Sequence, residues 1–84
     1  MIHRASPGFW TCYRRLPADT QRAADKAFEL LKRDARHPSL QFKKLDEVWS
    51  VRAGLHHRAL AVEATGGFLW FWIGTHADYD RIAG

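Results

Sequence analysis

Three residues in the second half of the chain combine types that could act on a phosphodiester. Arg58 lies in an alternating apolar stretch, His76 follows an apolar run and Gly74, and Tyr79 comes three residues later. An arginine fork matches phosphate oxygens and stays charged, and a histidine titrates near neutral pH. RNA cleavage without a metal needs a base to activate the ribose 2′-hydroxyl, a cation for the phosphoryl oxygens and an acid for the leaving 5′-oxygen. A tyrosine can orient the phosphate or stack on a base.

Further basic residues in the same half could hold an RNA backbone. Lys43 and Lys44 are adjacent in a predicted strand, so they point to opposite faces and at most one of them reaches a given site. Arg52 ends the next predicted strand, and His57 belongs to an adjacent histidine pair that could supply a base. The sequence therefore predicts RNA-binding roles for Lys43, Lys44, Arg52 and His57.

Each candidate also has a simpler structural interpretation. Arg58 could be an edge arginine paired with Glu63 or Asp78, and His76 could cap a helix or lie exposed to solvent. The adjacent histidines sit at a bend, where such pairs usually form loop surface. Sequence alone leaves both interpretations open.

The charge of the chain suits a polyanionic or acidic partner. The 84 residues carry 13 Lys and Arg against 9 Asp and Glu, a net charge of +4 with neutral histidines. A basic domain attracts nucleic acid or an acidic protein, although a solvated basic surface explains so small an excess equally well. A chain of this length should form one domain, residues 1–84, with a small core.

Cysteine and apolar content restrict the chemistry and the compartment. Cys12 is the single cysteine, which excludes an internal disulfide and metal sites built from several cysteines. The histidines lack a zinc-ligand spacing and there is no glycine-rich phosphate loop, so we predict neither a metal nor a cofactor. The N-terminus lacks a secretion signal, and the longest apolar run, 68–73, is too short for a membrane helix. We therefore expect a cytoplasmic protein without membrane contact.

Two helices are predicted in the first half of the chain. Ser6 and Pro7 are typical of a helix start, and that helix should end near Leu16 because Pro17 disfavours helical geometry in the residue before it. Pro17 opens the second helix, which the His37-Pro38 pair should stop. Apolar residues at spacings of three and four make its core face, namely Ala24, Ala27, Phe28 and Leu31.

From Leu40 onward the pattern is typical of strands. Strands are predicted over 40–45, 48–53, 57–63 and 68–73, with a hairpin turn over 64–67. The last run is uniformly apolar, which predicts a central strand covered on both faces and ended by Gly74. A short strand over 2–5 and a polar tail over 75–82, with room for one helical turn, complete the elements.

This order predicts an α+β fold. Strands joined by short turns pair antiparallel, and the helices that precede them pack on one sheet face. We expect two N-terminal helices on a curved antiparallel sheet of four strands, to which residues 2–5 could add a fifth. The other face would stay open and, lined with Lys, Arg and His, could bind an anion. Trp70 and Trp72 could stack on bases, but strand tryptophans in so small a chain are more often core.

Three stretches together resemble the RelE/ParE superfamily, the toxin halves of bacterial type II toxin–antitoxin pairs. They are HPSLQFKKL, VWSVRAGLHHRALAVE and the ending FLWFWIGTHADYDRI, and the resemblance extends from about Phe9 to Ile82. Each stretch alone is weak evidence. Their combination is more specific, because it joins a strand arginine after a bend to a Gly-ended apolar strand followed by His and Tyr.

The resemblance implies cleavage of mRNA on the ribosome without a metal, and neutralisation by a cognate antitoxin protein. It implies that Arg58 contacts the scissile phosphate, that His76 transfers a proton or stabilises charge, and that Tyr79 stacks or orients. It also implies RNA contacts for Lys43, Lys44 and Arg52.

Two branches of the superfamily differ in activity. RelE-like members are endoribonucleases that inhibit translation, whereas ParE-like members inhibit DNA gyrase without cleavage. His76 and Tyr79 favour the ribonuclease branch, although Tyr79 lies closer to Gly74 than the C-terminal tyrosine of RelE-like members does. The tail also lacks a second cation unless Arg81 serves. A gyrase inhibitor and a silent co-repressor are the alternatives.

Overall fold

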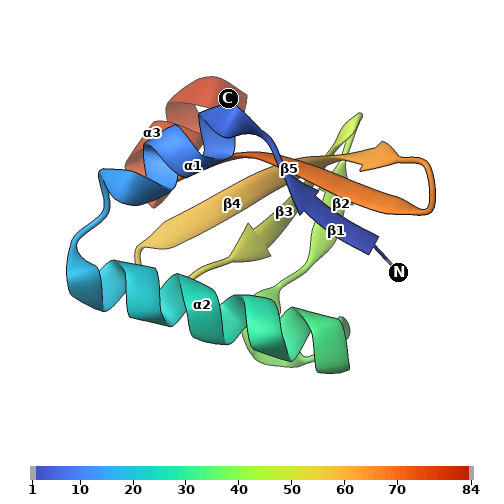
Figure 1. Ribbon diagram of the computed structural model, residues 1–84, viewed down its shortest axis with the longest axis horizontal. Coiled ribbons are helices and arrows are strands. Elements are labelled where there is room, and N and C mark those ends of the chain that lie inside the picture. Colours follow the sequence, from blue (N-terminus) through green and yellow to red (C-terminus); the bar gives the residue numbers. More distant parts are fainter. Residues whose placement is uncertain (1, 84) are drawn as a thin grey trace.

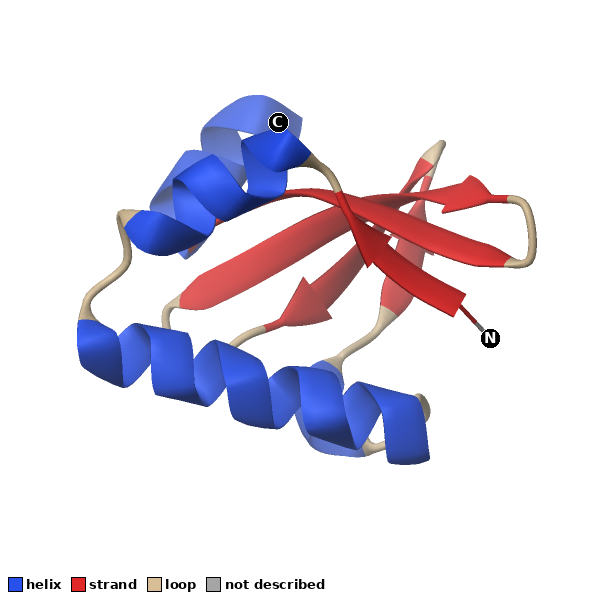
Figure 2. Cartoon of the chain, in the orientation of Figure 1, coloured by secondary structure: helices blue, strands red, loops and turns tan. Residues whose placement is uncertain are grey.

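A five-stranded sheet packs against three helices, the longest of which runs below it in Figure 1. The computed structural model describes residues 2–83, and Figure 2 distinguishes its helices from its strands. The α+β class and the packing of the first two helices are confirmed. The elements are β1 (Ile2–Ala5), α1 (Pro7–Arg14), α2 (Ala18–Arg33), a 3-10 turn (Pro38–Leu40), β2 (Lys43–Leu45), β3 (Val48–Arg52), β4 (His57–Ala64), β5 (Gly67–Thr75) and α3 (His76–Ala83).

Helix α1 begins where the Ser-Pro signal predicts. The Phe9 amide donates to Ser6 Oγ over 3.2 Å, and Pro7 takes the first helical position, where no N–H is needed. The helix ends at Arg14, two residues before the predicted end at Leu16.

Helix α2 starts directly after Pro17, as predicted, but it ends at Arg33 and not at the histidine–proline pair. Asp34 leaves the helical conformation, with φ −154° and ψ 83°. Its carboxylate then accepts a hydrogen bond from the Arg36 amide at 3.2 Å. A side chain that bonds its own backbone two residues on offers an alternative to another helical turn.

The segment before β2 departs most from the prediction of a strand over 40–45. Leu40 belongs to a 3-10 turn, in which His37 Nδ1 accepts from the Ser39 amide at 3.2 Å. Gln41 follows in the left-handed region, with φ 45° and ψ 45°. Only three residues, Lys43–Leu45, therefore pair with β3.

Strands β3, β4 and β5 form an antiparallel meander close to the predicted ranges. Gly66, with φ 77°, takes the positive-φ position of the β4–β5 turn. Gly74 does not end the last strand, because β5 continues to Thr75 and Gly74 pairs with Arg58. A Cβ at Gly74 would come within 2.5 Å of the Trp72 ring, so the bare backbone makes room for that indole.

Strand β1 makes the sheet mixed rather than antiparallel. It pairs parallel with β5, in a register from Ile2 with Gly67 to Ala5 with Trp70. The strand order is β1-β5-β4-β3-β2, which places β5 in the interior as its apolar run predicts. Because α1 follows β1 at once and packs on β5, the short strand and the helix together cover this side of the sheet.

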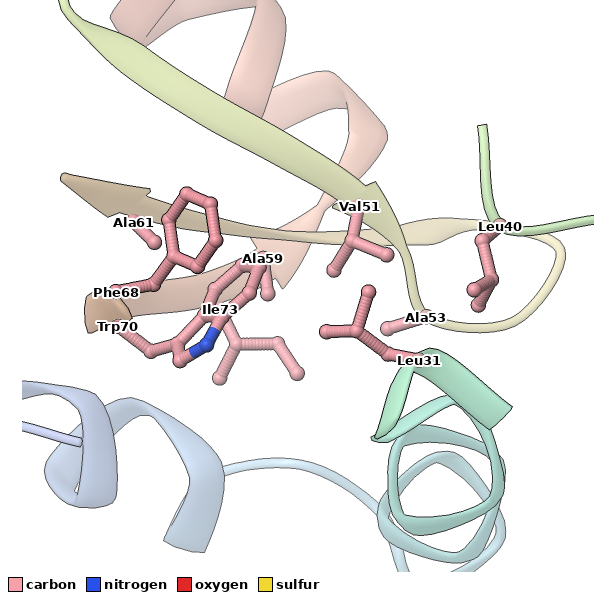
Figure 3. Packing of buried hydrophobic residues seen from close by; sticks show 9 residues of the cluster. All are labelled: Leu31, Leu40, Val51, Ala53, Ala59, Ala61, Phe68, Trp70 and Ile73. Carbon is pink, nitrogen blue, oxygen red and sulfur yellow. The ribbon is translucent and has the colours of Figure 1, made fainter. Parts of the chain in front are cut away.

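The hydrophobic core lies between the sheet and helices α1 and α2 (Figure 3). Its largest member is Trp70, which is 5% exposed, and Leu31 from α2 is 4% exposed. Cys12 packs against this core as a structural residue. The remaining members are Leu40, Val51, Ala53, Ala59, Ala61, Phe68 and Ile73.

The C-terminal tail is a helix of eight residues rather than one turn. Thr75 Oγ1 accepts from the Asp78 amide at 3.0 Å, which caps its start. Helix α3 packs on β4 and β5 from the face opposite α1 and α2, so that face is partly covered and not open. No helix in residues 2–83 is long and apolar enough to cross a membrane.

Candidate functional site

Alternation along β3 and β4 sends polar side chains to the sheet face away from α1 and α2. Val51 and Ala59 belong to the core, so Ser50, Arg52 and Arg58 point the other way. Arg52 and Arg58 are direct partners in the antiparallel register. Like charges opposed across a strand pair repel each other, so an anion bound between them would stabilise this arrangement.

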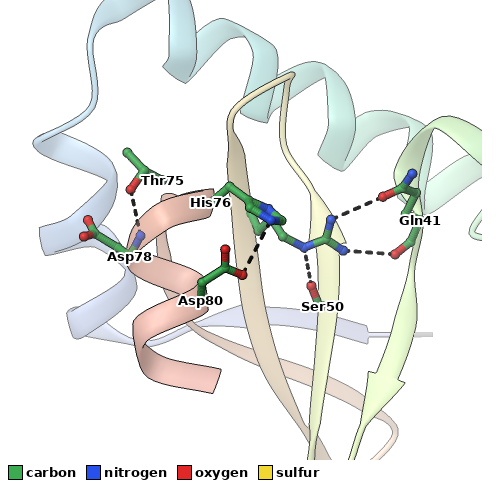
Figure 4. Close-up of polar contacts among 7 residues, drawn as sticks. Gln41, Ser50, Thr75, His76, Asp78 and Asp80 are labelled. Carbon is green, nitrogen blue, oxygen red and sulfur yellow. Dashed lines mark hydrogen bonds and ion pairs between the residues drawn. The ribbon is translucent and has the colours of Figure 1, made fainter. Parts of the chain in front are cut away.

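Arg58 is held by neutral acceptors and not by a carboxylate. Its Nε donates to Ser50 Oγ over 2.7 Å, and its two terminal nitrogens donate to Gln41 Oε1 at 3.4 Å and to the Gln41 carbonyl at 3.3 Å (Figure 4). The residue is 4% exposed, and burial lowers the pKa of its guanidinium. An arginine nevertheless stays charged in proteins, so a buried positive charge with neutral partners lies here.

The proposed edge pairing of Arg58 with Glu63 or Asp78 does not occur. Strand β4 is internal, Glu63 contacts Lys44, and Asp78 contacts Arg81. The side chains that hold Arg58 come from β3 and from the residue after the 3-10 turn.

Tyr79 lies against Arg58 and not at the surface. It is 8% exposed, and the guanidinium carbon of Arg58 sits 5.4 Å from its ring centroid. Its ring centroid is also 5.7 Å from that of His76, as expected for residues three apart on one helix face. The structure thus brings the three predicted catalytic residues together, with Tyr79 behind the arginine.

A pocket of about 310 Å³ opens beside this arginine. None of the residues that line it carries a carboxylate, and five of them are arginines or histidines. Its polar lining and positive charge suit a phosphate-sized anion. We name it the cationic pocket; its lining residues are Gln41, Arg52, Leu55, His56, His57, Arg58 and His76.

His57 opens β4 at the wall of the cationic pocket and is paired in register with Thr75. Burial lowers the pKa of His57 below its ordinary value of 6.5, and the charge of His56 lowers it further. A lowered pKa keeps the imidazole neutral at neutral pH, which is the form that accepts a proton.

His76 reaches the same pocket from the first residue of α3. Its backbone amide donates to the His56 carbonyl at 2.7 Å, which ties the helix start to the β3–β4 connection. Its Nε2 lies 3.5 Å from an Asp80 carboxylate oxygen, a contact that orients the ring (Figure 4). The imidazole is more than half exposed and can therefore meet a substrate.

The two lysines lie outside the cationic pocket. Lys43 pairs with Ser50 in register and so shares the face of Arg58, whereas Lys44 pairs with Trp49 on the core side. Lys44 Nζ contacts Glu63 at 3.1 Å, and Glu63 also accepts from the Trp49 indole at 3.0 Å. Alternation thus separates the lysine pair as predicted, and only Lys43 flanks the candidate site.

Three pocket-region residues carry no signal in the sequence pattern. Gln41 and Ser50 contact Arg58 from 17 and 8 residues away. Leu55 is 79% exposed at the pocket wall, where an isolated leucine in a turn attracts no notice. Within residues 2–83, no group of three or more His, Cys, Asp or Glu side chains could hold a metal ion.

The fold of this chain is similar to that of solved structures. No model of a known protein family matches the sequence, and no curated protein matches it. A chain of the RelB-RelE antitoxin-toxin complex from Methanococcus jannaschii superposes with a TM-score of 0.73 at 9% identity, covering 96% of this chain and 99% of that one. The YoeB/ParE toxin from Agrobacterium tumefaciens gives 0.66 at 19% identity, over 90% and 99% of the two chains. The protein therefore has a RelE/ParE-like toxin fold.

Proposed function

We propose that this protein is the toxin of a toxin–antitoxin pair and that it cleaves mRNA on the ribosome. One observation carries the proposal: Arg58 and His76, from different elements, line one pocket that has no carboxylate on its wall. A basic pocket of this kind recognises a phosphodiester by charge and by the arginine fork. The RelE/ParE-like fold adds ribosome-bound mRNA as the substrate expected from the resemblance.

The pocket residues divide the chemistry among them. Neutral His57 takes the proton of the ribose 2′-hydroxyl, whose oxygen attacks the adjacent phosphorus. Arg58, with Arg52 opposite, stabilises the charge that gathers on the phosphoryl oxygens. The bond from phosphorus to the 5′-oxygen breaks, and His76 gives that oxygen a proton. The products are a 2′,3′-cyclic phosphate and a 5′-hydroxyl end.

An antitoxin protein is the partner that the proposal requires. A basic domain with net charge +4 attracts an acidic protein chain. The RelE counterpart was solved as a complex with the antitoxin RelB, and this precedent supports the same class of partner here.

The decisive experiment incubates the purified protein with ribosomes and a defined mRNA and maps the new RNA ends. We expect cleavage that needs ribosomes, leaves cyclic phosphate ends and falls about 100-fold or more in His76→Ala. His37→Asn is the matched control, because His37 is exposed and lies outside the pocket, and asparagine keeps a side-chain acceptor for the Ser39 amide.

The same preparation distinguishes the alternative activity. A gyrase inhibitor would leave the mRNA intact and would block supercoiling by purified DNA gyrase, with or without His76. That pair of results would refute the nuclease and support the ParE-like alternative. Intact mRNA together with active gyrase and normal growth would point to a silent co-repressor.

A further inference from the structure

Two uncharged residues, Ser50 and Gln41, accept hydrogen bonds from the buried Arg58, and neither belongs to the hydrophobic core. Ser50 is 0% exposed in a strand whose neighbour Val51 is core, and its hydroxyl accepts from Arg58 Nε at 2.7 Å. Gln41 accepts from Arg58 through both its carbonyl and its side-chain oxygen. We propose that Ser50 and Gln41 are positioning residues that fix the Arg58 guanidinium for a phosphodiester; this inference rests on the proposed function.

The backbone conformation of Gln41 allows both of its oxygens to reach Arg58. A residue other than glycine rarely adopts positive φ, and here φ is 45° and ψ is 45°. That conformation turns the carbonyl and the side chain of one residue toward the same guanidinium, at 3.3 and 3.4 Å. The unfavourable backbone geometry is therefore offset by two hydrogen bonds to one charged group.

Ser50 and Gln41 suit an anion-binding site because neither side chain is charged. An aspartate or glutamate in either place would hold the arginine more strongly but would cancel its charge. The three hydrogen bonds leave two of the five guanidinium N–H groups without a partner within residues 2–83. With Tyr79 against the guanidinium, an incoming phosphate meets a charged fork whose orientation is already set.

Three substitutions distinguish the loss of a hydrogen bond to Arg58 from a change in the charge beside it. Ser50→Ala removes one acceptor from a buried site, and Gln41→Gly keeps the positive φ while removing the side-chain acceptor. Gln41→Glu keeps an acceptor but adds a negative charge beside Arg58. The matched controls are Thr65→Ala and Gln21→Glu, because Thr65 is an exposed hydroxyl residue in the β4–β5 turn and Gln21 lies in α2.

The first measurement is the ¹⁵N NMR signal of the Arg58 Nε–Hε group in the protein alone. In the wild type the bond to Ser50 should slow its exchange with water, and a short RNA with 2′-O-methyl groups, which cannot be cleaved, should shift it. We expect Ser50→Ala to speed the exchange by about tenfold. We also expect Gln41→Glu, but not Gln21→Glu, to weaken binding of this RNA by about tenfold or more.

The second measurement is the rate of mRNA cleavage on the ribosome. Ser50→Ala and Gln41→Gly keep the charge of Arg58, so we expect kcat to fall by about tenfold while KM stays within about threefold. Gln41→Glu should also raise KM. A residue with a purely structural role would lower the melting temperature without this division between kcat and KM.

The outcomes for the two proposals can be told apart. If the wild type does not cleave mRNA, the proposed function fails, and the NMR and binding measurements alone judge the inference. Equal Nε–Hε exchange and equal RNA-induced shifts in wild type and Ser50→Ala would overturn it, as would normal kcat in both Ser50→Ala and Gln41→Gly. It would also be overturned if the wild-type signal did not respond to the 2′-O-methyl RNA.

Discussion

The two faces of the sheet each bury an aromatic ring beside a basic side chain, with opposite consequences. On the face covered by α1 and α2, the Trp70 indole donates to His3 Nδ1 at 3.0 Å, and His3 stacks on Phe68. On the other face, Tyr79 packs against Arg58. Burial lowers the pKa of His3, so this imidazole is neutral and behaves as one more aromatic ring. Arginine cannot shed its charge in the same way, and its face keeps a cation.

The two cavities, one beside Trp70 and His3 and the other beside Arg58, also differ in polarity. A cavity of about 260 Å³ between α1, α2 and the sheet is lined mostly by apolar and aromatic side chains, with Arg4 and Asp25 as the charged exceptions. The cationic pocket on the opposite face is lined by nitrogen-bearing side chains and one leucine, Leu55. We infer that the first face supplies most of the stability and the second the chemistry, because burying a charge with neutral partners costs free energy that packing elsewhere must offset.

The largest effect that tests this division is on stability. Trp70→Ala removes a ring that is 5% exposed, and we expect it to lower the free energy of unfolding by about 3–5 kcal/mol. Trp10→Ala is the matched control, because Trp10 is 44% exposed and should cost about 1 kcal/mol or less. Urea denaturation measures both. If folded Trp70→Ala at low temperature cleaved less mRNA per molecule than the wild type, the face covered by α1 and α2 would contribute to the chemistry as well as to stability.

The next effect is on the other face and on activity. Arg58→Lys keeps a positive charge but loses the planar fork, so we expect the cleavage rate to fall by about 100-fold or more. Arg22→Lys, at an exposed ion pair with Asp19, is the control and should cleave normally. Single-turnover cleavage on ribosomes and a thermal melt of each protein provide the readout. Near-normal cleavage by Arg58→Lys would show that charge alone suffices there.

Local signals in the sequence predict most of the fold. The Ser6 cap, the apolar stripe of α2 and the glycine turn of the β4–β5 hairpin depend on neighbouring residues, and each lies where predicted. The exception is Phe28, predicted as part of the core face of α2, which is 39% exposed and does not belong to the core. The parallel pairing of β1 with β5 joins residues such as Ile2 and Gly67, and no local pattern encodes such a partner. Helix α3 is also longer than predicted, and its Tyr79 is buried in contacts with strands distant in the sequence.

The candidate site divides in the same way. Arg58 and His76 stand out by residue type and by their places around Gly74, and their shared pocket follows from the β4–β5 register. Gln41 does not stand out, because its role depends on a left-handed backbone and on an arginine 17 residues away. Residue type therefore identifies which groups could react, whereas the groups that orient them appear only with the three-dimensional contacts.

A smaller effect concerns the pH dependence of the cleavage rate. Burial and the charge of His56 lower the pKa of His57, so this base should stay neutral below the ordinary value of 6.5. We expect the acidic limb of kcat/KM to have its midpoint below pH 6.5 and to move upward in His56→Ala, which removes the neighbouring charge. His37→Asn, which keeps an acceptor for the Ser39 amide, is the control and should leave the profile unchanged. A midpoint above 6.5 in the wild type would argue against His57 as the base.

The smallest effect distinguishes two neighbouring lysines by the face each occupies. Lys43 shares the face of Arg58, so Lys43→Ala should weaken RNA binding by about threefold and reduce the salt dependence by about one charge. Lys44 pairs with Glu63 on the core side and is half-exposed, so Lys44→Ala should change affinity by less than about twofold. Binding of a 2′-O-methyl RNA over a series of salt concentrations measures both slopes. Equal slopes for the two variants would mean that RNA does not follow the face of the sheet that holds Arg58, and the contrast between the two faces would then apply to the pocket alone.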